Sequence, residues 1–160
     1  MNRTAALFLA LIALPALADA PDTPTPRTPI QQYRHQIMEL VGDHTGALGD
    51  IIDGEVERPN RDVIGHATAL YELAQIHRDL FPEGSGPEVG RTRALPAVWE
   101  LPDDFKKANK AFVRSTSRLV EAAKDGDKKR IEDAFGKVGE SCGGCHKTFR
   151  KPRDKKKKKK

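Results

Sequence analysis

The sequence predicts an all-α protein, an antiparallel four-helix bundle. Apolar residues recur about every 3.6 residues in four separate stretches, which is the pattern of amphipathic helices that share a core. Two of the connections between these stretches are short and one is long, and short connections place consecutive helices side by side in opposite directions. The alternation of apolar and polar residues that is typical of strands does not occur, and no internal repeat is visible.

The first predicted helix begins at Thr28 and Pro29, because threonine is a common N-cap and proline a common first helical residue. Its apolar positions run at helical spacing from residue 30 to residue 52, and Gly54 is expected to end it. Glycine weakens a helix by up to about 1 kcal/mol relative to alanine, yet this stretch contains several. We therefore expect something bulky, either a partner helix or a flat ring, to approach closely at these glycines. They are Gly42, Gly46 and Gly49.

The other three helices follow from the same periodicity. The second is predicted from residue 60 to about residue 81, and residues 83–93 are expected to form a long loop because glycine and proline interrupt them. The third opens at Pro102, and the Asp-Gly-Asp of residues 125–127 predicts a tight turn before the fourth. Proline cannot continue a helix, so the fourth helix is expected to end at residues 151–152.

Both cysteines of the chain lie in one short motif on the predicted fourth helix, Cys142-Gly143-Gly144-Cys145-His146. Two cysteines three residues apart, followed directly by histidine, are typical of c-type haem attachment. On a helix the two side chains share a face, so both sulfurs can form thioethers to one ring while His146 offers its imidazole to the iron. Because Cys142 and Cys145 continue the apolar stripe of this helix, we expect one covalently attached haem c in the core of the bundle.

Other interpretations of the two cysteines stay open. In a haem-free, exported binding module the thiols would form a disulfide. In a thioredoxin-like protein they would form a redox pair, although that motif occurs near βαβ units and no strands are predicted here. A structural zinc site is disfavoured because it needs four cysteine or histidine ligands, and the chain has no second cysteine pair.

The N-terminus predicts export. Residues 1–18 have the pattern of a signal peptide: Arg3 supplies positive charge, and the apolar run of residues 5–17 is too short to span a membrane. Small residues precede the expected cleavage after Ala18, and cleavage after Ala20 also fits, whereas a buried N-terminal helix is the alternative. Residues 19–29 are rich in proline and threonine and are expected to be a flexible lead-in. Export to a bacterial periplasm agrees with covalent haem attachment.

The excess of basic residues belongs to the C-terminal tail. Residues 19–150 carry 19 basic and 22 acidic side chains, so we expect no nucleic-acid binding by this part of the chain. Residues 151–160 are a Lys-rich block whose default state is disorder. The functional alternative is that this tail contacts an acidic redox partner or an anionic membrane surface.

Four groups of residues together resemble the cytochrome c-prime family, the class II c-type cytochromes. The resemblance implies an exported four-helix bundle over residues 30–150, with the haem motif on the last helix. The groups are Tyr33-Arg34 with Met38, Leu95-Pro96-Ala97-Val98-Trp99, Phe135-Gly136-Lys137-Val138-Gly139 and the block from Cys142 to Arg150.

The resemblance also implies what surrounds the iron. Members with an apolar residue of the first helix over the iron are five-coordinate and bind nitric oxide or carbon monoxide, whereas members with methionine there are six-coordinate and low-spin. Met38 occupies this position, so we expect Met38 and His146 to ligate the iron of a one-electron carrier that cycles between Fe(III) and Fe(II). The alternative is that Met38 only fills the core and the haem binds nitric oxide or carbon monoxide.

Two arginines are further candidates for the haem site. The resemblance implies that Arg34 lies near a haem propionate and that Arg150 lies near the proximal histidine, where an arginine–carboxylate contact is reasonable. The alternative for each is a solvated charge on a helix face. Redox proteins are the expected partners. The resemblance also implies a homodimer through the first two helices. No acid–base constellation indicates an enzyme. The other histidines are expected to be structural or at the surface: His35, His44, His66 and His77.

Overall fold

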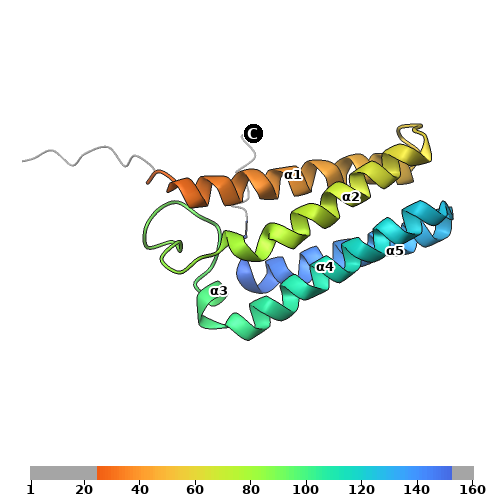
Figure 1. Ribbon diagram of the computed structural model, residues 1–160. Coiled ribbons are helices and arrows are strands. Elements are labelled where there is room, and N and C mark those ends of the chain that lie inside the picture. The colour runs from red at the N-terminus through yellow and green to blue at the C-terminus, as the bar shows by residue number, and fades with distance from the viewer. Residues whose placement is uncertain (1–24, 153–160) are drawn as a thin grey trace, which may run out of the picture.

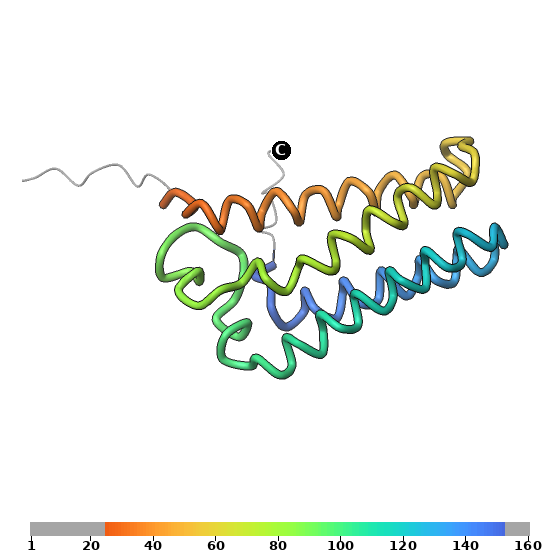
Figure 2. The backbone as a smooth tube through the Cα atoms, viewed as in Figure 1, coloured from red at the N-terminus to blue at the C-terminus, as the bar shows by residue number. Residues whose placement is uncertain are grey.

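Four long helices make up most of the described chain, which covers residues 25–152 of this computed structural model (Figure 1). They are α1 (Pro29–Ile52), α2 (Asn60–His77), α4 (Pro102–Asp125) and α5 (Lys128–Phe149). Successive long helices run in opposite directions, so the first turns of α1 and the last turns of α5 lie at the same end (Figure 2). The predicted all-α four-helix bundle is confirmed. Residues 25–152 contain no strand, only an isolated bridge between Ala94 and Arg150.

Three predicted segments fall wholly or largely outside the described residues. These are the signal peptide (1–18), residues 19–24 of the lead-in and residues 153–160 of the tail. What the sequence indicates for them stays a prediction. Among the helices of residues 25–152, none is long and apolar enough to cross a membrane.

The predicted helix boundaries depend on local caps that the structure confirms. The backbone N–H of Gln31 donates to Thr28 Oγ1 at 3.4 Å, and the N–H of Thr28 donates back to Gln31 Oε1 at 3.0 Å. This reciprocal pair is a capping box, which satisfies two backbone donors that the first turn of α1 leaves free. At the other end of the bundle, Gly126 ends α4 with a φ of +74°, a conformation that favours glycine.

The connection between α2 and α4 differs from the prediction. Helix α2 ends at His77, and a 3₁₀ turn (Arg78–Leu80) continues it for three residues. A short helix, α3 (Ala97–Glu100), then precedes α4 and was not predicted. Four residues are too few to show a helical period, and α3 is instead held by the burial of Val98, which is 4% exposed.

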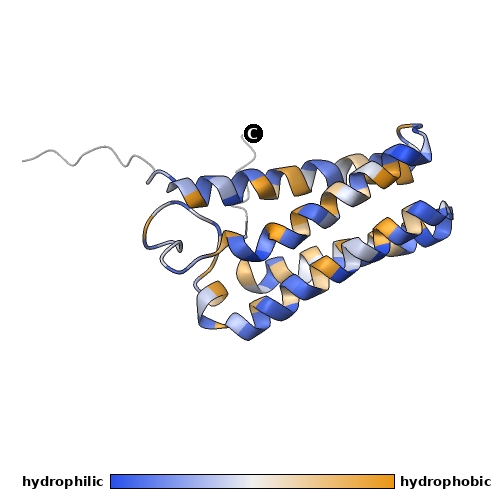
Figure 3. Cartoon of the chain, in the orientation of Figure 1, coloured by the Kyte–Doolittle hydropathy of each residue, from blue (hydrophilic) through white to orange (hydrophobic). Residues whose placement is uncertain are grey.

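The core consists of two clusters along the bundle. Hydrophobic and hydrophilic residues alternate along each long helix (Figure 3). The main cluster runs between all four long helices and includes the fully buried Leu48, Leu70 and Leu119. The second cluster lies beside α3, where Val98, Phe105 and Phe149 are buried. It links α3, α4 and the last turn of α5, and so closes the end of the bundle that carries the cysteine motif.

The glycines of α1 do not pack as the sequence analysis expects. A Cβ atom at Gly42 or Gly46 would meet no heavy atom within 4 Å, and at Gly49 it would meet only the ring of Phe135, at 3.9 Å. Within residues 25–152 no other helix packs on Gly42 or Gly46, because the face of α1 that carries them is exposed in the single chain. The flat ring stays a prediction.

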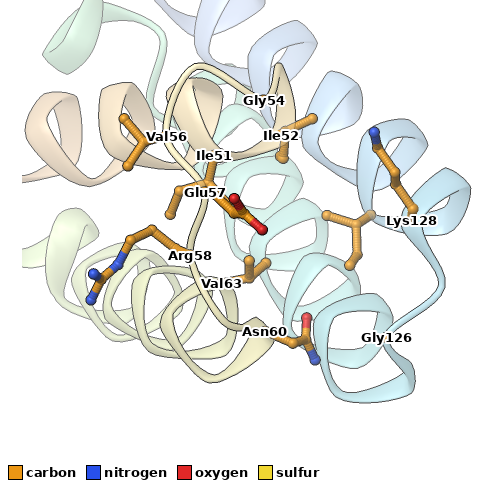
Figure 4. A pocket seen from close by; sticks show the side chains of 11 residues that line it. Ile51, Ile52, Gly54, Val56, Glu57, Arg58, Asn60, Val63, Gly126 and Lys128 are labelled. Atoms are coloured by element: carbon orange, nitrogen blue, oxygen red, sulfur yellow. The ribbon is translucent and has the colours of Figure 1, made fainter.

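A pocket of about 410 Å³ lies at the end of the bundle remote from α3, where the loop after α1 meets the α4–α5 turn (Figure 4). Ile51, Val63 and Ile131 supply apolar surface to it, and the side chain of Glu57 points into it. None of the residues predicted for the haem site lines this pocket.

Candidate haem-binding site

The residues predicted for the haem site lie in α1, in α5 and directly after α5, at one end of the bundle beside α3 and the long loop (Figure 1). Arg34 and Met38 come from the first half of α1, and the cysteine motif comes from the last two turns of α5. Helix α5 packs along α4, whereas α1 and α5 touch each other only slightly. The antiparallel topology thus brings both sets to the same end without packing one helix tightly on the other.

Both cysteines are partly buried and both are free thiols. Cys142 packs against the main core cluster and Cys145 against the second cluster, so the motif lies where the two clusters meet. Burial raises the pKa of the Cys142 thiol and raises the pKa of Cys145 to about 11. The thiols are therefore protonated near neutral pH. The structure gives no support to the disulfide alternative.

The imidazole of His146 is half-buried and electrically neutral. Burial is the main cause and the positive charge of Arg150 a smaller one, and together they lower the pKa of His146 to about 4. Well above pH 4 the ring keeps a free lone pair, which is the form that binds a metal. Within residues 25–152 the ring donates or accepts no hydrogen bond.

Arg34 is buried, with only 4% of its surface exposed, so the solvated-charge alternative is wrong for it. Its guanidinium donates to the carbonyl oxygens of Leu80 and Ser85 at 3.2 and 2.8 Å. It also donates to the hydroxyls of Ser85 and Thr92, at 3.2 and 3.1 Å, and lies 4.7 Å from the centre of the Phe81 ring. These contacts attach the long loop to α1. The contact with a propionate stays a prediction.

Gln31 assists Arg34 and was missed by the sequence analysis. It lies one helical turn earlier on the same face of α1 and is 2% exposed. Its side-chain amide donates to the carbonyl oxygens of Ser85 and Gly86 at 3.3 and 2.7 Å. The available signal was the spacing of Gln31 and Arg34, which puts two polar side chains on the buried face of one helix.

Arg150 lies beside the cysteine motif, as the resemblance implies. Its positive charge lowers the pKa of His146 and opposes the rise in the pKa of both thiols, which requires proximity to all three groups. The backbone around Arg150 is hydrogen-bonded to the end of the long loop and the residues that follow it. The N–H of Leu95 donates to the Phe149 carbonyl at 3.0 Å, and the N–H of Lys151 donates to the Arg93 carbonyl at 2.8 Å.

Met38 is partly buried and packs against the main core cluster, the same cluster that Cys142 contacts. Ligation of iron by Met38 and simple core filling both require this burial. The position therefore agrees with both interpretations, and ligation stays a prediction.

His77 is a buried residue near this site whose environment the sequence analysis did not predict. It is 7% exposed, its Nδ1 lies 2.7 Å from Asn109 Oδ1, and its ring lies among Phe81, Phe105 and Phe112. Burial lowers the pKa of His77, so it packs as a neutral side chain. The sequence did contain a sign of this burial, because His77 lies on the apolar stripe of α2. That position favours a buried, structural histidine over one at the surface.

Comparison with known proteins decides the family. A family model described as Cytochrome C′ matches residues 29–150. The cytochrome c′ of Pararhodospirillum photometricum is 33% identical over 119 residues, which cover 74% of this chain and 94% of that protein. Cytochrome c-554 of Cereibacter sphaeroides is 35% identical over 149 residues, or 91% of this chain and 94% of the relative. This chain belongs to the cytochrome c′ family.

A solved structure agrees with this assignment. A nitric oxide complex of a cytochrome c prime variant from Alcaligenes xylosoxidans superposes with a TM-score of 0.71 at 27% identity. The match covers 77% of this chain and 94% of that one. The sequence and structure comparisons thus agree on the cytochrome c′ family.

Proteins of the cytochrome c′ family carry a covalently attached c-type haem, and the residues of this chain fit one. Cys142 and Cys145 supply two reduced thiols on one helix, and His146 supplies a neutral imidazole beside them. A Cβ atom at Gly143 or Gly144 would meet no heavy atom within 4 Å, so the stretch between the cysteines is not occluded. When bound, the haem supplies an iron that changes between ferric and ferrous states and can take a further ligand.

Proposed function

We propose that this chain is an exported c-type haem protein that binds nitric oxide or carbon monoxide, with His146 as the protein ligand of the iron. The neutral imidazole of His146 beside two free thiols, in a chain of this family, supports the haem-protein part of the proposal. The observation that carries the gas-binding part is the similarity of this chain to a structure solved as a nitric oxide complex. The role of the protein is then binding of a small gas rather than catalysis.

A second candidate function is one-electron transfer, which depends on Met38 as a ligand of the iron. Met38 lies on α1 at the end of the bundle that carries the motif, and packs against the cluster that Cys142 contacts. A methionine sulfur bound to the iron opposite histidine would raise the reduction potential of the haem and would occupy the site that a gas needs. This protein would then pass electrons between redox partners.

One set of spectra separates the two functions. The protein is matured with its haem in a host that assembles c-type cytochromes, and absorption spectra are recorded for the ferric form and for the ferrous form under carbon monoxide. Gas binding predicts a high-spin ferric spectrum and formation of the carbon monoxide complex in the unaltered protein. Electron transfer through a Met38 ligand predicts a low-spin spectrum with a weak band near about 700 nm and no carbon monoxide complex.

Variants at two positions of α1 sharpen the test. If Met38 is a ligand, Met38→Ala turns the protein high-spin and opens it to carbon monoxide, whereas a five-coordinate protein keeps its spin state. Gln36→Ala is the matched control, because Gln36 lies on the same helix and is exposed. A low-spin protein that refuses carbon monoxide until Met38 is replaced contradicts the gas-binding proposal.

We further propose a periplasmic location and a homodimer formed through α1 and α2. Exposed apolar side chains on these two helices support the dimer, namely Tyr33, Leu40 and Ile76. Analytical ultracentrifugation of the haem-loaded protein tests it, and Leu40→Glu should shift the protein toward monomer. A monomer at high concentration contradicts this part of the proposal.

A further inference from the structure

His44 of α1 and His66 of α2 form a pair that the haem site does not use. Their Nδ1 atoms lie 2.9 Å apart, and the two rings meet edge to face with centroids 5.1 Å apart. Both side chains are partly exposed, so solvent reaches the pair. Two neighbouring helices therefore aim one imidazole nitrogen each at the same point near the surface of the bundle.

The separation of the two nitrogens suits a metal ion as well as a shared proton. Imidazole nitrogens bind divalent first-row metals at about 2.0–2.1 Å. Two nitrogens 2.9 Å apart then subtend an angle of about 90° at the metal. This is the angle between adjacent ligands in square-planar or octahedral coordination, the geometries typical of Cu²⁺ and Ni²⁺. A tetrahedral ion such as Zn²⁺ would need the nitrogens about 0.4 Å further apart.

We propose that His44 and His66 form a two-ligand site for Cu²⁺ or Ni²⁺, with water in the other coordination positions. No third histidine, cysteine or carboxylate within residues 25–152 joins the pair to complete a protein-only site. Two imidazoles make a site of modest affinity that stays open to exchange. Imidazole suits these metals better than carboxylate or water does, so a bare pair of histidines selects them over Mg²⁺ and Ca²⁺.

The pair is separate from the haem-binding residues. His44 follows Met38 by six residues on α1, a rise of about 9 Å along the helix axis. His66 precedes the buried His77 by eleven residues on α2, a rise of about 16 Å. Substitution of the pair should therefore leave the haem spectrum unchanged, which makes the haem an internal check on folding.

The test uses the ferric, haem-loaded protein made without a polyhistidine tag. Cu²⁺ is added and electron paramagnetic resonance is recorded, and Ni²⁺ binding is measured by calorimetry. The expected results are one ion per chain and a copper signal split by two nitrogens. Replacing a residue that only hydrogen-bonds to a metal ligand costs about 10–100-fold in metal affinity. Replacing a ligand itself, by His44→Gln or His66→Gln, should therefore weaken binding at least about tenfold.

His35→Gln is the matched control. His35 also lies on α1, but it is paired with Glu39 at 3.1 Å rather than with another histidine. This variant should bind Ni²⁺ as the unaltered protein does. The proposal is overturned if neither ion binds saturably, or if replacing both His44 and His66 leaves the affinity and the copper signal unchanged.

Discussion

Replacing Arg34 with glutamine tests whether this side chain holds the long loop against the bundle. The guanidinium makes four hydrogen bonds, all of them to residues between Leu80 and Thr92. It also lies over the rings of Phe81 and Trp99, at 4.7 and 5.9 Å from their centres. Glutamine is shorter and uncharged, so it cannot reach the same set of partners.

The loss of stability expected for Arg34→Gln depends on which hydrogen-bond acceptors are left without a donor. The Ser85 carbonyl keeps a hydrogen bond from Gln31, whereas the Leu80 carbonyl loses its bond from Arg34. A buried acceptor left without a partner costs about 1–3 kcal/mol, and the lost contact with the aromatic rings about 0.5–2 kcal/mol. We expect the free energy of unfolding to fall by about 2–4 kcal/mol.

Urea unfolding of the haem-loaded protein, followed by circular dichroism, measures this effect. With a dependence on urea of about 1–3 kcal/mol per molar, the midpoint should fall by about 1–2 M. The control is Arg118→Gln, because Arg118 is exposed on α4 and its replacement should change stability by at most about 0.5 kcal/mol. Trypsin should also cleave the long loop of the Arg34 variant faster, after Arg91. Equal midpoints for Arg34→Gln and Arg118→Gln would refute the reasoning.

Three further substitutions are expected to act through other features of the fold. Leu119→Ala leaves a cavity at a fully buried position and should lower the free energy of unfolding, measured by urea unfolding, by about 2–5 kcal/mol. A loss below about 1 kcal/mol would mean that the core is loosely packed there. Thr28→Ala removes the capping box of α1 and should cost about 0.5–2 kcal/mol by the same assay, with Thr148→Ala, an exposed change, as the control. Burial lowers the pKa of His77 from its usual 6.5. Below pH 6.5 the imidazole therefore binds a proton in the unfolded chain but not in the folded chain. The free energy of unfolding then falls as the pH decreases toward the folded-state pKa. His77→Gln should therefore make the urea midpoint depend less on pH below 6.5, and an unaltered pH profile would contradict this.

The elements that could be predicted are those whose cause is local in the chain. Thr28 and Pro29 begin α1 through a cap made within one turn, and Gly126 ends α4 because its backbone adopts a positive φ. The attachment motif is equally local, since two cysteines and a histidine carry its chemistry within five residues. The short helix α3 escaped prediction because its stability comes from burial of Val98 rather than from its own four residues.

The sequence by itself determined the four long helices, the order in which they follow one another and the motif that identifies a c-type haem protein. Only the tertiary structure decided what surrounds that motif. Arg34 donates hydrogen bonds to a loop about fifty residues away. His77 forms a hydrogen bond with Asn109 of another helix, and His44 contacts His66 between α1 and α2. Spacing along the chain defines which face a side chain shares on its own helix, whereas the packing of that face on another helix chooses its partner.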